Sequence, residues 1–152
     1  MRTSLKVVIC GIVLLAMGSL AYAGFAKPED AIRYRKAVMT VIGQHFGRLA
    51  AVVKGQAPYD KKDVEHNAMV IRTMAELPWD AVMFPGSDMG DTTLNASAMQ
   101  EKDKFMRVAR QFEDAAQKLA ETANSGDLQA VKAQFGEVAG VCKSCHSAYR
   151  KP

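Results

Sequence analysis

Three residues near the end of the chain have the types and spacing for covalent and metal chemistry: Cys142, Cys145 and His146, in the order C-x-x-C-H. On a helix, residues three and four apart share one face, so the two thiols and the imidazole would project together. Such thiols can add to the vinyl groups of a porphyrin, and the histidine can bind its iron. The motif predicts one haem c per chain, attached through Cys142 and Cys145, with His146 as axial ligand.

Two other kinds of site use a C-x-x-C pair. A thioredoxin-like redox pair follows a strand in a βαβ unit, and no strand pattern precedes Cys142. A structural zinc site takes four ligands, usually from two such pairs. The remaining cysteine, Cys10, lies in a segment that we expect to be removed. Haem attachment is therefore the favoured interpretation.

Residues 1–23 have the pattern of a secretory signal peptide. Arg2 and Lys6 precede an apolar run over residues 7–17, and Ala21-Tyr22-Ala23 resembles a cleavage site. An uncleaved membrane anchor is the alternative, but the apolar run is short for a bilayer. We expect a soluble periplasmic domain over residues 24–152. Periplasmic export agrees with the motif, because bacteria attach c-type haem outside the cytoplasm.

The charge balance excludes some classes of partner. The chain has 20 Lys and Arg against 16 Asp and Glu, and two of the basic residues lie in the signal segment. Such a mild excess gives no reason to expect a nucleic acid or an anionic membrane as partner.

Four segments have apolar residues at helical spacing, and helix stop signals separate them. The last carries Val138, Cys142, Cys145 and Tyr149 on its apolar stripe, which would place the haem inside the protein. Short first and third connections predict antiparallel neighbours. The fold class is therefore all-α: an up-down-up-down four-helix bundle with covalently bound haem. The expected helices are 28–53, a second from 60 or 61 to 77, 98–123 and 128–150, with 78–97 as a long non-helical connection in which Trp79 is a core anchor.

The position of the motif and four further stretches carry a family resemblance. Residues 25–31, 45–48, 52–60 and 77–79 resemble those of β-proteobacterial cytochromes c′, the class II c-type cytochromes. The resemblance covers the whole chain after the signal segment. It implies a homodimer, a five-coordinate high-spin haem and an apolar distal pocket that binds small gases. A second apolar face on the first helix, over residues 41 and 50–52, is compatible with a dimer.

Arg35 lies one turn before Met39, near the buried stripe, where a charge needs a partner. A haem propionate would supply one, and the resemblance implies an arginine in that role; the alternative is an arginine that extends to solvent. Lys36 stands where the family often has a glutamine that contacts the haem edge, so it departs from the pattern.

Three further residues are expected near the haem. Asp91 and Thr93, in the long connection, match positions that approach the haem edge in relatives. Arg150 lies one turn beyond His146, where it would either approach the haem or offset the helix dipole. The other histidines, His45 and His66, lie off the core stripe or among charges, so we expect both to be solvated and a bis-histidine haem to be absent.

Met39 divides two functional hypotheses. If its sulfur only fills space, the iron is five-coordinate and binds NO or CO, and the protein sequesters or senses NO in the periplasm. If the sulfur binds iron, the protein is a six-coordinate, low-spin electron carrier with an unidentified redox donor. The resemblance to cytochromes c′ favours a methionine that does not ligate. The absence of a distal His/Arg pair argues against peroxidase chemistry, so no enzyme activity is predicted.

Overall fold

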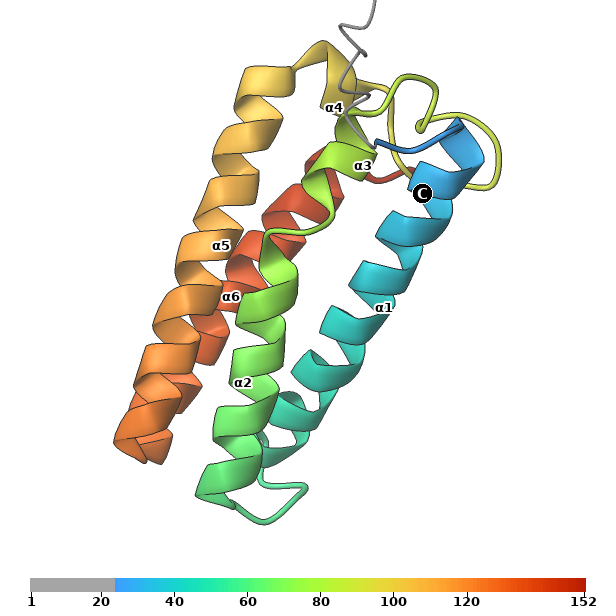
Figure 1. The fold of residues 1–152 in the computed structure, drawn as a ribbon. Coiled ribbons are helices and arrows are strands. Elements are labelled where there is room, and N and C mark those ends of the chain that lie inside the picture. Colours follow the sequence, from blue (N-terminus) through green and yellow to red (C-terminus); the bar gives the residue numbers. More distant parts are fainter. Residues whose placement is uncertain (1–23) are drawn as a thin grey trace, which may run out of the picture.

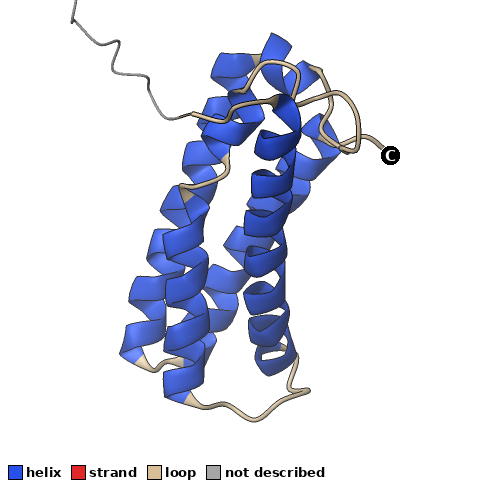
Figure 2. Ribbon diagram, turned by 45° about the vertical axis from the view of Figure 1, so that its right-hand side comes forward, coloured by secondary structure: helices blue, strands red, loops and turns tan. Residues whose placement is uncertain are grey.

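The computed structural model describes residues 24–152, and the predicted signal segment 1–23 lies outside this range. Within the described residues, four long helices run side by side, and two short helices lie at one end (Figures 1 and 2). The long helices alternate in direction along the chain, which confirms the predicted up-down-up-down bundle. The helices are α1 (Pro28–Val53), α2 (Lys61–Ala75), α3 (Trp79–Met83), α4 (Ser97–Gln100), α5 (Lys102–Ser125) and α6 (Leu128–Tyr149).

Local signals set the ends of the long helices. Pro28 begins α1, where its missing N–H costs nothing. Gly55 and Gly126 follow α1 and α5 with φ of +71° and +77°, the left-handed conformation that glycine adopts without strain. The Asp60 carboxylate caps α2 by accepting from the Asp63 N–H, and Asp127 caps α6 in the same way.

The connection between the second and third long helices differs from the prediction. The segment 78–97 contains α3 and the first residue of α4. Pro78 ends the preceding turn and is also the N-cap of α3. The helix α2 ends at Ala75, and the Leu77 N–H bonds the Met74 carbonyl in a tighter turn. The predicted helix from 98 is divided at Glu101, and α5 continues to Ser125.

Apolar side chains from all four long helices form one core. The helix α5 buries eight residues, whereas α6 buries only three: Val131, Val138 and Tyr149. The motif-bearing half of α6 faces a cavity instead of close-packed core. Within residues 24–152, no helix is both long and apolar enough to span a bilayer. The most deeply buried core side chains include Leu49, Val64, Ile71, Leu119, Val131 and Val138.

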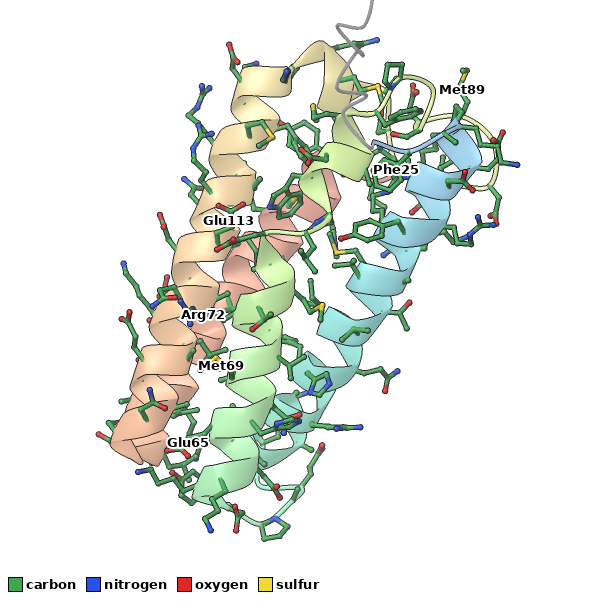
Figure 3. All side chains as sticks on the ribbon, viewed as in Figure 1. Phe25, Glu65, Met69, Arg72, Met89 and Glu113 are labelled. Atoms are coloured by element: carbon green, nitrogen blue, oxygen red, sulfur yellow. The ribbon has the colours of Figure 1, made fainter. Side chains whose placement is uncertain are left out.

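Residues 84–95 form a connection that we call the edge loop. It lies beside the start of α1 and the segment that follows α6 (Figure 1), at the end of the bundle where Phe25 and Met89 are seen in Figure 3. Two backbone hydrogen bonds join the loop to the residues after the haem motif. The Asn95 N–H donates to the Tyr149 carbonyl at 2.8 Å, and the Lys151 N–H donates to the Thr93 carbonyl at 2.7 Å.

Candidate haem site

A cavity of about 550 Å³ opens among α1, α5, α6 and the edge loop. Its volume falls within the usual range for ligand and cofactor pockets. The nine site residues predicted from the sequence all line it, although they come from three separate parts of the chain. They are Arg35, Lys36, Met39, Asp91, Thr93, Cys142, Cys145, His146 and Arg150.

The α6 wall carries the C-x-x-C-H side chains. The motif lies wholly within helix, so the predicted common face for Cys142, Cys145 and His146 is present. Burial raises the pKa of the Cys142 thiol, and burial together with the neighbouring Cys142 raises the pKa of Cys145 to about 11. Burial, with the charge of Arg150, lowers the pKa of His146, which favours the neutral imidazole that binds metals.

The α1 wall is largely apolar. Met39, Ile42 and Phe46 line it, and the Phe46 ring stacks on Phe135 of α6 with centroids 4.2 Å apart. The hydroxyl of Thr40, a polar group on this wall, donates to the Lys36 carbonyl at 2.8 Å. That hydrogen bond occupies the hydroxyl proton, so Thr40 has no free donor to offer a ligand in the cavity.

Aromatic side chains close the inner end of the cavity. The Trp79 ring packs edge-on against Phe105 and Phe112, at centroid distances of 5.8 and 6.2 Å. Phe105 in turn packs against Tyr149, 5.1 Å away. Trp79 is buried, as expected for a core anchor, and it also lines the cavity. These rings give the site a largely apolar floor.

Arg35 connects α1 to the edge loop. Its Nη1 donates to the Ala81 carbonyl at 3.1 Å and to the Ser87 Oγ at 3.3 Å. Its Nη2 donates to the Ser87 carbonyl at 3.0 Å and to the Thr92 Oγ1 at 2.7 Å. Arg35 is 7% exposed, and burial lowers the pKa of its guanidinium. The partners of this buried charge are therefore groups of the chain itself.

Lys36 and Lys151 add contacts to the same loop. The Lys36 Nζ lies 2.8 Å from the Asp91 carboxylate, in an exposed ion pair. The Lys151 Nζ donates to the Asp88 carbonyl, also at 2.8 Å. Exposed pairs of this kind stabilise little, so the buried Arg35 contacts dominate the attachment of the loop.

The chemistry of the lining fits a c-type haem. Two thiols and an imidazole lie on one wall, in the order and spacing that thioether attachment and iron ligation require. The facing wall and the floor are apolar, as a macrocycle needs, and charged side chains gather at the mouth. The family model for cytochrome c′ matches residues 30–150.

The chain belongs to the cytochrome c′ family. A cytochrome c′ of Alcaligenes xylosoxydans is 43% identical over 127 residues, covering 84% of this chain and 98% of the relative. The cytochrome c′ of Rubrivivax gelatinosus is 38% identical over 128 residues, with the same two coverages. Cytochromes c′ are non-enzymatic haem proteins, and membership implies a c-type haem.

Solved cytochrome c′ structures share the fold. A nitric oxide complex of an Alcaligenes xylosoxidans cytochrome c′ variant matches with a TM-score of 0.79 and 42% identity, covering 84% of this chain and 98% of that one. A carbon monoxide complex of another variant matches with a TM-score of 0.78 and 42% identity, covering 84% and 99%. The crystal structure from Rubrivivax gelatinosus matches with a TM-score of 0.80 and 38% identity, at the same coverages.

Sequence reasoning missed some of the residues that shape this cytochrome c′ site. Ser87 and Thr92 hold Arg35, and Ser87 is fully buried, yet both lie in a loop without periodicity. The proline and glycines at 85, 86 and 90 indicated a turn but could not indicate its partners. The signal that could have found them is a serine or threonine among turn residues, because such side chains often form hydrogen bonds to nearby backbone groups.

The two remaining histidines do not line the haem cavity. His66 is exposed, as predicted. The prediction for His45 is wrong, because the ring is half-buried and its Nδ1 lies 2.8 Å from the Asn67 Oδ1 of α2. The partner comes from a different helix, which the spacing of residues along α1 does not reveal.

Proposed function

We propose that this cytochrome c′ holds one haem c through Cys142 and Cys145, with His146 as its one axial ligand, and binds NO or CO on the side of α1. The iron of such a haem supplies the site for a diatomic ligand and one-electron redox chemistry. The observation that carries the proposal is the apolar α1 wall, formed by Met39, Ile42 and Phe46, across the cavity from the motif. Solved relatives in NO and CO complexes support it.

The polarity of this wall favours particular ligands. NO and CO are neutral and need no hydrogen bond from the protein, so apolar side chains accommodate them. Bound O₂ is stabilised by a distal donor, and the Thr40 hydroxyl is already bonded to the Lys36 carbonyl. We infer that the site discriminates against O₂, and that the protein sequesters NO or takes part in electron transfer with a redox donor.

Charged residues at the mouth would hold the propionate side of the haem. We assign this role to Lys36 and Arg150, with Asp91 and Thr93 at the same edge. Both Nη atoms of Arg35 are bonded to the protein, so its contribution to a propionate is through Nε–H or through its charge. The main role that we assign to Arg35 is to position the edge loop.

The absorption spectrum of the ferrous holoprotein tests this function. We expect a high-spin spectrum that changes to a low-spin carbonyl spectrum on addition of CO, because His146 alone occupies an axial position. A low-spin spectrum that CO leaves unchanged would contradict the proposal. That result would favour a second function, a six-coordinate electron carrier. Met39 lines the cavity and would be the sixth ligand in that case.

We further propose a periplasmic homodimer. The location rests on the signal-peptide pattern of residues 1–23. The dimer rests on the family and on half-buried apolar residues of α1 beyond its buried stripe, Val41 and residues 50–52. Sedimentation of the holoprotein at micromolar concentration should give the mass of two chains, and the mass of one chain would contradict the assembly.

A further inference from the structure

Apart from the haem cavity, two histidines of neighbouring helices lie close together. His45 belongs to α1 and His66 to α2, and their ring centroids are 5.7 Å apart with planes at 62°. Two imidazoles bound to one metal ion at about 2.1 Å have centroids between about 4.5 Å apart at a 90° bond angle and about 6.4 Å apart at 180°. The spacing of this pair therefore suits a shared metal ion.

The hydrogen bonds of Asn67 determine which nitrogen of His45 carries a proton. One side-chain atom of Asn67 lies 2.6 Å from the Asp63 carbonyl oxygen, so it must be the amide nitrogen, which donates. The other atom, the amide oxygen, lies 2.8 Å from the Nδ1 of His45. Since that oxygen can only accept, Nδ1 carries the proton. In the neutral ring the lone pair is then on Nε2, the nitrogen free to bind a metal.

This arrangement has the form of a supported metal ligand. Histidines that bind metals usually donate their other N–H to a carboxylate or carbonyl, which fixes the ring and its tautomer. Asn67 plays this part here, and it is only 7% exposed, so its amide is held firmly between the helices. His66 is exposed and reaches the same region from α2.

The surroundings limit the coordination to two protein ligands. Among residues 24–152, no group of three or more His, Cys, Asp or Glu side chains is placed to bind a metal. Glu65, next to His66, lies on the side of α2 nearest α5 (Figure 3) and pairs with Lys61 at 3.4 Å. Water would complete the coordination sphere, which excludes a closed structural zinc site.

We propose that His45 and His66 form a surface site for a divalent transition-metal ion, with Cu²⁺ preferred. Imidazole nitrogen suits Cu²⁺, Ni²⁺ and Zn²⁺, and Cu²⁺ is the tightest binder of the three at a given site. This site is separate from the haem cavity, which neither histidine lines.

Titration of the holoprotein with Cu²⁺ at neutral pH tests this proposal, since His146 is then occupied by iron. We expect one ion per His45–His66 pair and an electron paramagnetic resonance spectrum with coupling to two imidazole nitrogens. His66→Gln should remove one nitrogen and weaken binding at least about tenfold. Asn67→Leu should weaken binding by about 10–100-fold, the usual effect of losing a residue that orients a ligand.

Gln44→Ala, a change at the exposed neighbour of His45, is the matched control and should bind Cu²⁺ as the wild type does. Far-ultraviolet circular dichroism would establish that each variant remains helical. Equal Cu²⁺ binding by the wild type and the His66→Gln variant would overturn the proposal, as would a spectrum without imidazole coupling. The CO spectrum should be the same in all these variants, so this result is independent of the gas-binding function.

Discussion

Replacing Arg35 with methionine should lower the free energy of unfolding by about 3 kcal/mol, because several buried acceptors lose their donor at once. Methionine preserves much of the length and apolar contact of arginine but donates no hydrogen bond. The carbonyls of Ala81 and Ser87 and the hydroxyl oxygens of Ser87 and Thr92 then lose the guanidinium. Chemical denaturation of the holoprotein, followed by circular dichroism, measures the difference.

Arg33→Met is the control for this prediction. Arg33 lies two residues earlier on α1, and its side chain is 77% exposed and pairs with Asp30. Its replacement should change stability by no more than about 0.5 kcal/mol. Faster amide exchange at Leu94, whose N–H donates to Thr92, should accompany the Arg35 change alone. Equal losses in the two variants would show that Arg35 does not hold the edge loop.

Met39→Ala should leave the resting iron high-spin and accelerate CO association about tenfold or more. The side chain lines the α1 wall, and its truncation removes atoms from the space a diatomic ligand would take. Relief of a steric barrier of about 1.4 kcal/mol corresponds to a factor of ten. Flash photolysis of the ferrous carbonyl complex measures the rate.

Met39→Leu separates steric exclusion from ligation. Leucine has a similar bulk but no sulfur, so the proposed function predicts a CO rate near that of the wild type. If the Met39 sulfur binds iron, the wild type is low-spin, and both variants become high-spin. Conversion of the resting spectrum by the leucine change would therefore contradict the five-coordinate assignment and support the electron carrier.

Much of the bundle could be predicted because its signals are local. Pro28 and Gly55 bracket α1, and the bounds predicted from them agree with the structure. Helical spacing also placed Cys142 and Cys145 on one face, since three residues make nearly a full turn. The turn at Pro78 was harder, because a proline that ends one helix can equally begin the next.

The contacts that the sequence did not reveal join distant segments. Arg35 was expected to meet a haem propionate, and the structure gives it partners 46 to 57 residues away, at Ala81, Ser87 and Thr92. The spacing along α1 predicts that a charge near the core needs a partner but cannot say which loop supplies it. The same holds for His45, whose partner Asn67 lies on another helix.

The attachments of the edge loop indicate where this chain would tolerate inserted residues. Exposed connections between helices are usually the places where proteins accept insertions. The edge loop is bonded to α1 through Arg35, to the end of α6 through Asn95, and to Lys151 beyond it through Thr93. An insertion near Ser87 or Thr92 would displace these bonds and disturb both walls of the cavity together. Added residues should be better tolerated at 55–58, which do not line the cavity and lie where α1 turns into α2.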